Sequence, residues 1–214
     1  MIPIVSVVGE SGSGKTELVV RLVPELQKRG RCVGTIKHHV HTGNLDIEGK
    51  DTYRHAQAGV GEICLSGPDG ICFFRKVEKE LTLDEIASWY FADADFILTE
   101  GYKREDKPKI EVIRGEGEMA PLSAESELIA VVSDGTVKTD VPVFRMNEAD
   151  KLADLLVEKF PLPELKNEVR VRVNGKIIVL KSFVKAFIGN TIKGMLVSLR
   201  GCKKPEKIDL RMGK

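Results

Sequence analysis

The stretch GESGSGKT at residues 9–16 decides the fold, because it matches the pattern G-x-x-x-x-G-K-[ST]. The apolar run IPIVSVV at residues 2–8 precedes it and predicts a buried parallel strand. Residues 15–29 follow with apolar side chains at helical spacing. Between a strand and a helix, the glycines let backbone N–H groups surround phosphates, while Lys15 reaches the β- and γ-phosphates and Thr16 offers its hydroxyl to Mg²⁺. The stretch therefore predicts a phosphate-binding loop for a nucleotide.

Strands alternate with helices through the rest of the first 160 residues. Further strands are predicted at 31–36, 95–99, 109–114, 128–133 and 142–145, and helices at 53–58, 83–92 and 147–160. A pair of strands, 62–66 and 71–76, flanks the turn signal at 67–70. This alternation predicts an α/β fold of the P-loop NTPase-like type, with a mostly parallel sheet and helices on both faces.

The charge changes sign along the chain. Of its 214 residues, with a net charge of +1, residues 1–165 hold 20 Lys and Arg against 29 Asp and Glu. Residues 166–214 hold 13 against 3. Such asymmetry indicates two units rather than one. We therefore predict a P-loop nucleotide-binding domain over 1–163 and a small basic module over 164–214.

The basic tail has its own pattern of elements. Residues 169–173 and 177–180 flank Asn174-Gly175, which predicts a β-hairpin with a tight turn. A helix is expected over 183–199 with Ser182 as its N-cap, and a last strand over 207–212. The tail thus reads as an α+β module of ββαβ order, with Phe183 and Phe187 expected in its core.

Composition predicts a cytoplasmic protein without a membrane segment. Hydrophobic residues make up 42% and charged residues 30%, which argues against a disordered chain. No apolar run approaches the roughly 20 residues needed to span a bilayer, and the N-terminus lacks the basic start of a signal peptide. The four cysteines form no CxxC pair, so reduced thiols are expected.

Polar residues at the predicted strand ends are the candidates for chemistry. Glu100 and Gly101 end the strand 95–99, where a carboxylate could hold Mg²⁺ or orient an attacking water, and where a glycine N–H could approach a γ-phosphate. Lys37 ends another strand and is a fixed charge suited to phosphate. Asp134 follows the strand 128–133 and could accept hydrogen bonds from N1 and N2 of guanine, or could be a turn residue. The chain has no Asn-Lys-x-Asp signature, so the residues themselves support guanine only weakly.

All four histidines, His38, His39, His41 and His55, lie in one polar segment that follows Lys37. Three interpretations are open: a transition-metal site, donors to phosphate or a partner, and a solvated loop. The pair His38-x-x-His41 lacks a third ligand at zinc-like spacing. A long polar loop in a compact domain is usually functional, which favours the phosphate or partner contact.

Taken in order, GESGSGKT, KHHVH, GKDTYRHAQAG, LTEGYK and AVVSD make residues 2–160 similar to the MobB family, the molybdopterin-guanine dinucleotide biosynthesis adapter proteins. The resemblance implies a homodimeric GTP-binding protein with Mg²⁺ and weak GTPase activity. It also implies, as partners, molybdopterin and the guanylyltransferase that joins GMP to it. Carried over by position, Lys37 and His38 lie near the nucleotide, Glu100 with Gly101 faces the γ-phosphate and Mg²⁺, and the phosphates are bound by Gly12, Ser13, Gly14, Lys15 and Thr16.

Two other function classes remain open. A small-molecule kinase would also use a P-loop and a strand-end carboxylate, although residues 115–127 contain no Arg or Lys for a phosphate-covering lid. A scaffold could bind nucleotide with negligible turnover. For the basic module, docking to a protein or to the anionic cofactor is favoured over nucleic acid or a plain solvated surface.

Overall fold

The structure is a computed structural model that describes residues 2–39, 47–115, 117–162, 169, 171–173, 176–178, 180–199, 202 and 208. His41, Asp46, the Asn174-Gly175 turn and most of the predicted strand 207–212 lie outside these residues. The chain divides into two compact units, Met1–Pro161 and Leu162–Lys214. Each unit is described by itself below.

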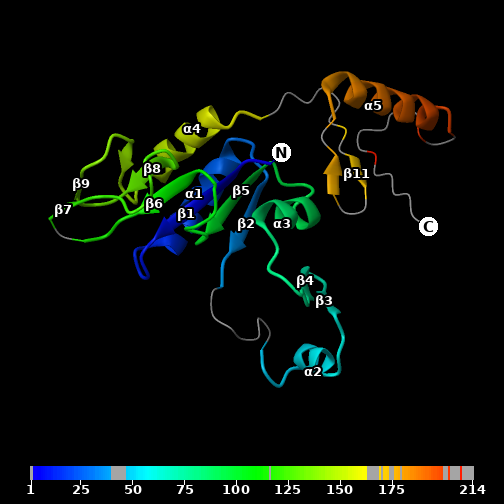
Figure 1. Ribbon diagram of the computed structural model, residues 1–214, viewed down its shortest axis with the longest axis horizontal. Helices are drawn as coiled ribbons and strands as arrows, with labels where there is room; N and C mark the ends of the chain where they lie inside the picture. The colour runs from blue at the N-terminus through cyan, green and yellow to red at the C-terminus, as the bar shows by residue number, and fades with distance from the viewer. Residues whose placement is uncertain are drawn as a thin grey trace. The chain divides into compact units, whose positions relative to one another are not determined.

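A six-stranded sheet of parallel strands forms the centre of unit 1 (Figure 1). Its strands, in spatial order, are β10 (Val143–Phe144), β8 (Leu128–Val132), β6 (Lys109–Val112), β1 (Ile4–Gly9), β5 (Phe96–Glu100) and β2 (Val33–Lys37). From β1 the chain crosses to β2 at one edge, returns through β5, and then passes β1 to reach β6, β8 and β10, so the direction of its connections reverses beside β1. Open parallel sheets bind their ligands at the carboxyl ends of the strands beside such a point.

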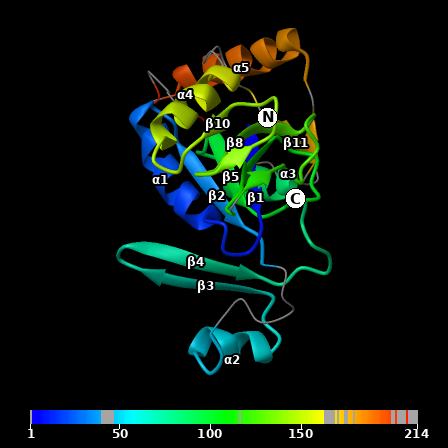
Figure 2. The same ribbon diagram turned by 90° about the vertical axis from the view of Figure 1, so that its left-hand side faces the viewer.

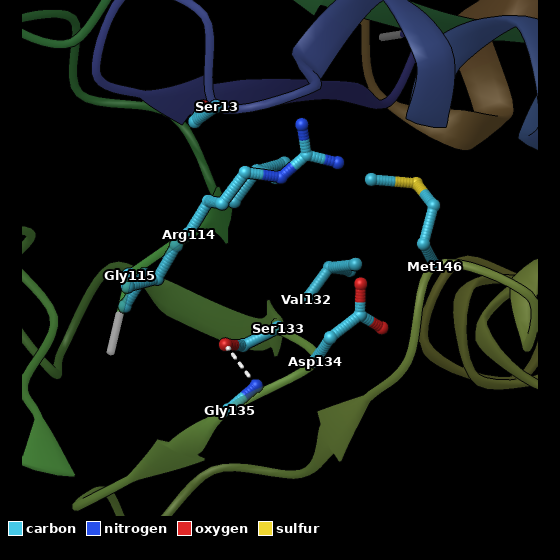
Figure 3. Close-up of a pocket in the computed structure, with 10 residues that line it drawn as sticks. Ser13, Arg114, Gly115, Val132, Ser133, Asp134, Gly135 and Met146 are labelled. Carbon is cyan, nitrogen blue, oxygen red and sulfur yellow. Dashed lines mark hydrogen bonds between the residues drawn. The ribbon is translucent and has the colours of Figure 1, made fainter. Parts of the chain in front are cut away.

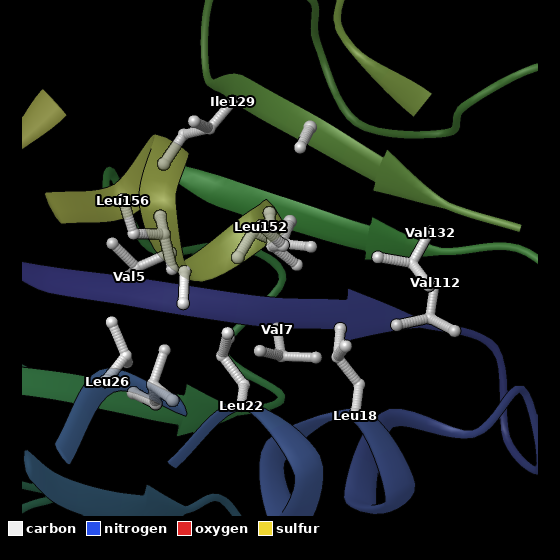
Figure 4. Close-up of a cluster of buried hydrophobic side chains, with 14 of the residues drawn as sticks. Val5, Val7, Leu18, Leu22, Leu26, Val112, Ile129, Val132, Leu152 and Leu156 are labelled. Atoms are coloured by element: carbon white, nitrogen blue, oxygen red, sulfur yellow. The ribbon is translucent and has the colours of Figure 1, made fainter. Parts of the chain in front are cut away.

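Helices cover both faces of the sheet, which confirms the predicted α/β architecture. Helices α1 (Lys15–Lys28) and α4 (Ala149–Lys159) pack on one face around a core that includes fully buried Leu18, Leu22 and Leu26 (Figure 4). Helix α3 (Leu83–Tyr90) packs on the other face through Leu83 and Ala87. This two-sided burial explains why the strands are nearly continuous apolar runs.

The ends of these helices follow local sequence signals. Thr82 caps α3 in a capping box, in which its hydroxyl accepts from the backbone N–H of Glu85 and the Glu85 carboxylate accepts from that of Thr82. Gly30, with φ 78°, follows the last turn of α1 in the left-handed region that glycine adopts most easily.

An arm made of α2 (Asp51–Gln57), β3 (Glu62–Gly67) and β4 (Gly70–Arg75) lies between β2 and α3 in the chain (Figure 2). Its two strands form the predicted antiparallel hairpin. No residue of α2 is buried, and among the residues of β3 and β4, all of them described, Ile63 alone is buried. A short parallel pair that the sequence did not indicate, β7 (Glu118–Met119) with β9 (Thr136–Val137), links two loops of the body.

Unit 2 contains the hairpin β11 (Val171–Val173) and β12 (Lys176–Ile178), followed by α5 (Ser182–Val197). Two expectations for it are corrected. Ser182 is the first helical residue and Lys181 is the N-cap, whose extended backbone begins the helix without a side-chain cap. Phe183 and Phe187 are 79% and 63% exposed rather than buried, because they lie on the opposite side of α5 from its more buried residues. Within the described residues, no helix is both long and apolar enough to cross a membrane.

Candidate functional site

The loop between β1 and α1 adopts a conformation that its glycines make possible. Gly9 has φ 146° and Gly14 has φ 102°, both in the region that L side chains rarely adopt. A Cβ on Gly9 would also lie 2.4 Å from the carbonyl oxygen of Val112 on the neighbouring strand β6. The glycine is therefore required both for its backbone angles and for this close approach, which places the loop directly beside the end of β6.

Lys15 lies in the first turn of α1 and folds over this loop. Its Nζ donates to the carbonyl oxygen of Gly9 at 3.3 Å and to that of Glu10. Burial lowers the pKa of Lys15, and the positive charges of Lys103 and Lys37 lower it further, whereas Glu100 opposes them. A concentration of positive charge at a helix N-terminus is what polyphosphate binding needs.

The carboxylate of Glu100 joins three elements of the site. It ends β5, whose register sets Glu100 beside Val7 of β1 and Lys37 of β2. Its Oε2 accepts from the Thr16 hydroxyl at 2.9 Å, and its Oε1 lies 3.1 Å from Lys37 Nζ. The Glu100 side chain is only 16% exposed, whereas Lys37 is mostly exposed. The structure thus brings together the predicted residues Lys15, Thr16, Lys37 and Glu100.

The pair Thr16 Oγ1 and Glu100 Oε2 suits a Mg²⁺ ion. Both are oxygen donors, they lie 2.9 Å apart, and they stand beside the lysine of the phosphate loop. Mg²⁺ in nucleotide sites usually takes one or two protein oxygens and completes its shell with water and phosphate. Among the described residues no group of three His, Cys, Asp or Glu side chains could hold a metal. The two oxygens therefore fit a nucleotide-bound Mg²⁺ better than a metal held by protein alone.

His38 and Gly101 have other partners than the predicted nucleotide contacts. The His38 ring stacks on Tyr102, with centroids 4.3 Å apart and 14° between planes, and its Nε2 lies 2.9 Å from Glu80 Oε1. The N–H of Gly101 donates to the carbonyl oxygen of Val7 at 3.0 Å, which continues the ladder between β5 and β1. In this conformation the N–H is not free for a γ-phosphate, although Gly101 (φ 98°) turns the chain away from the sheet there.

A cavity of about 150 Å³ lies at the ends of β6, β8 and β10, next to the phosphate loop (Figure 3). Ser13 borders it from the loop, Met146 from the segment after β10, and Asp134 from the segment after β8. Ser133 braces the turn, because its hydroxyl accepts from the Gly135 N–H at 3.1 Å. Phosphates on the loop would leave the rest of a nucleotide beside this cavity, so it is where a base could lie.

Arg114 borders the candidate site, and the sequence analysis did not single it out. It lies two residues after the end of β6, lines both this cavity and an adjoining one of about 390 Å³, and its guanidinium lies 4.0 Å from Glu17. The available signal was its position at the carboxyl end of a predicted strand, the same signal that identified Lys37 and Glu100.

The comparisons with known proteins agree on one family. The model of the family described as "Molybdopterin guanine dinucleotide synthesis protein B" (MobB) matches residues 4–134. A molybdopterin-guanine dinucleotide biosynthesis adapter protein of Escherichia coli is 35% identical over 163 residues, which cover 74% of this chain and 93% of that protein. The crystal structure of a molybdopterin-guanine biosynthesis protein B is 28% identical, with a TM-score of 0.57, and covers 73% of this chain and 99% of its own.

The relatives differ in how much of this chain they match. The Bacillus subtilis MobB structure, 26% identical with a TM-score of 0.57, again covers 74% of this chain and 98% of its own. A relative from Methanocaldococcus jannaschii is 24% identical but covers 98% of this chain and 97% of itself. The shorter relatives thus match about as many residues as unit 1 contains, whereas the longer one also spans the length of unit 2.

Proposed function

The chain belongs to the MobB family of molybdopterin-guanine dinucleotide biosynthesis adapter proteins, and from this premise we propose that it is a GTP-binding adapter with slow GTPase activity. It would assist the guanylyltransferase that attaches GMP to molybdopterin. Slow hydrolysis suits an adapter, because the bound nucleotide then acts as a state that a partner can recognise.

The observation that carries this proposal is the shared carboxylate of Glu100. One oxygen holds the Thr16 hydroxyl and the other faces the Lys37 ammonium, at the end of the strand next to the phosphate loop. In hydrolysis, a water oxygen attacks the γ-phosphorus, the bond from that phosphorus to the β–γ bridging oxygen breaks, and GDP and phosphate leave. Glu100 is placed to orient the water, and Lys15 and Lys37 to balance charge that develops on the phosphoryl oxygens. Bound Mg²⁺ supplies further neutralisation of the phosphates.

The cavity beside the loop supports guanine as the base. The carboxylate of Asp134 could accept from both N1 and N2 of guanine, whereas adenine offers no donor at N1. The Arg114 guanidinium on the other side of the cavity can cover a base or meet a phosphate oxygen. A pocket that hydrogen-bonds donors on its ligand strongly rejects an analogue without them.

We expect the purified chain to bind GTP in preference to ATP and to release phosphate to water slowly. Calorimetry with each nucleotide and Mg²⁺, followed by measurement of labelled phosphate, tests this. When the guanylyltransferase and molybdopterin are added to the same samples, the dinucleotide should form faster with this chain present than without it. Transfer of the label to an organic acceptor would instead indicate a kinase, and binding without phosphate release would indicate a scaffold.

The arm supports a homodimer. On one face of its hairpin Leu65 stands opposite Cys72, and on the other Ile71 and Phe73 lie side by side in alternate positions of β4. Leu65, Ile71 and Phe73 are all exposed, Ile71 by 74%. A two-stranded hairpin is at best marginally stable without packing on at least one face. A second copy of the chain that covers these faces would bury them.

Replacing Ile71 and Phe73 by glutamate should convert the dimer into monomers, because two charges would enter the apolar contact. Sedimentation or light scattering at micromolar concentration measures the mass. The control is Val20→Glu, which changes an exposed valine on α1, outside the arm. A wild-type chain that is already monomeric, or a double variant that stays dimeric, would show that the arm does not hold two copies together.

A further inference from the structure

The chain turns sharply where β5 ends, in a conformation that one of its residues rarely adopts. Gly101 and Tyr102 follow Glu100 with φ 98° and φ 58°. Among the residues that the structure describes, Tyr102 is the only one other than glycine with a positive φ. A glycine would take this conformation without steric cost, so the tyrosine ring must contribute something that a glycine could not. Strained backbone of this kind gathers at functional sites, and here it directly follows the carboxylate of the candidate site.

The ring of Tyr102 lies against two parts of the body. It packs beside the core under α3, which includes Ile36 and Leu83. It also stacks on the imidazole of His38, with centroids 4.3 Å apart and 14° between planes. The edge of that imidazole is held as well, because its Nε2 lies 2.9 Å from Glu80 Oε1. We call His38 and Tyr102 the ring pair, in which the core fixes one ring and a carboxylate fixes the other.

The ring pair is joined to the backbone of Glu100. The N–H of His38 donates to the carbonyl oxygen of Glu100 at 3.0 Å. A Cβ on Gly101 would lie 3.1 Å from the Cβ of His38, so His38 also packs closely on the turn itself. The turn begins at Glu100, whose carboxylate contacts Thr16 and Lys37. A shift of the turn would therefore move the carboxylate that faces the phosphate loop.

Two other roles for the ring pair are less well supported. Direct contact of His38 with the nucleotide would require its ring to leave Tyr102 and Glu80, since these contacts engage both its face and its Nε2. Packing alone explains the partial burial of Tyr102, but it gives no reason for a left-handed residue directly after the site. Positioning accounts for the contacts and for the strained backbone together.

We propose that the ring pair positions Glu100 for GTP hydrolysis by holding the turn that follows β5. This role rests on the function proposed above. His38 and Tyr102 are positioning residues, because each acts through Glu100 and not on the nucleotide. Misplacement of a reacting group by about 1 Å can cost about 100-fold in rate, so even a small movement of the turn should be measurable.

Single-turnover GTP hydrolysis and GTP affinity, both measured on the full chain, test this role. Tyr102→Asn removes the ring but suits the left-handed backbone, which asparagine adopts more easily than most residues. It should lower the hydrolysis rate by about tenfold and change GTP affinity by less than about twofold. Tyr102→Phe, which keeps a stacking ring, should stay within about twofold of the wild-type rate. Tyr90→Asn is the matched control, because Tyr90 is 44% exposed at the end of α3 and lies outside the ring pair.

His38→Ala removes the stack in a second way, without any change in the residues of the strained turn. It should lower the hydrolysis rate by about as much as Tyr102→Asn, and it decides the question alone if Tyr102→Asn does not fold. Proton NMR gives a readout that does not depend on activity. In the wild type, the ring of Tyr102 should shift the carbon-bound imidazole protons of His38 upfield, Tyr102→Asn should abolish that shift, and Tyr102→Phe should keep it.

A double-mutant cycle separates positioning from an unrelated loss. In a chain that already carries Glu100→Gln, Tyr102→Asn should lower the rate by less than about twofold more, because the group that it positions has lost its role. A further loss of about tenfold in that background would overturn the positioning role. So would a wild-type rate in both ring-pair variants, a loss of GTP affinity as large as the loss of rate, or an equal loss of rate in Tyr102→Phe.

The wild type and the variants together distinguish this role from the proposed function. If the wild type binds and hydrolyses GTP and the ring-pair variants do so equally well, the positioning role fails and the proposed function stands. If the wild type neither binds nor hydrolyses GTP, the proposed function itself fails.

Discussion

Replacing Lys15 by alanine is expected to weaken GTP binding by about 100- to 1000-fold, which corresponds to about 3–4 kcal/mol. Lys15 reaches over the phosphate loop and donates to two of its carbonyl oxygens, so its ammonium lies at the loop that would bind the β- and γ-phosphates. Burial lowers the pKa of Lys15, and the nearby positive charges of Lys103 and Lys37 lower it further. A phosphate group relieves that repulsion, and this relief adds to the direct hydrogen bonds.

Calorimetry with GTP and Mg²⁺ measures this loss. Lys28→Ala is the matched control, because Lys28 ends the same helix, is exposed, and pairs with Glu25 far from the loop. An affinity of the Lys15 variant within about twofold of wild type would refute the phosphate-loop assignment. Because the side chain is only partly buried, the variant should keep the fold and its unfolding midpoint.

The sequence indicates which residues lie close together where strand ends decide their positions. A parallel sheet aligns the carboxyl ends of its strands at one edge, so polar residues that follow apolar runs must meet there. The register of the strands then sets the neighbours: Lys37 lies beside Glu100, and Glu100 lies beside Val7. Val7 comes two residues before Gly9, the glycine that opens the phosphate loop. Helix–strand alternation is equally local, because it depends on the spacing of apolar residues in each segment.

The contacts of other site candidates depend on partners far away in the chain. Whether the Gly101 N–H is free depends on Val7, which takes it into the ladder. His38 turns toward Tyr102 and Glu80, and no spacing within the histidine segment could indicate either partner. Tyr102 itself has φ 58°, a conformation that a tyrosine rarely adopts and that sequence patterns do not predict.

Helix α5 shows the limit of periodicity more clearly. Its sequence contains two apolar sides, Phe183 with Phe187 on one and Val184, Ile188 and Ile192 on the other. Helical spacing shows that each side exists, but it cannot tell which of the two is the more buried. Size would favour the phenylalanines, and the structure buries the β-branched side more deeply.

Replacing Glu100 by glutamine is expected to lower GTP hydrolysis by about 100-fold while changing GTP affinity by less than about fivefold. Glutamine keeps the length of the side chain, and its amide oxygen can still accept from the Thr16 hydroxyl. What is lost is the negative charge that orients the attacking water and balances Lys37. That charge matters most in the transition state, so the turnover rate should fall far more than the binding.

Single-turnover hydrolysis and equilibrium GTP binding, measured on the same preparation, separate these two effects. Glu80→Gln is the matched control, because Glu80 is a carboxylate of the same region that pairs with His38 instead of Thr16. The control should leave the hydrolysis rate within about twofold of wild type. If Glu100→Gln also leaves the hydrolysis rate within about twofold of wild type, then Glu100 only pairs with Lys37 and Thr16 at the edge of the sheet. The water-orienting group would then have to be sought elsewhere, whereas the role of Lys15 in binding would be unaffected.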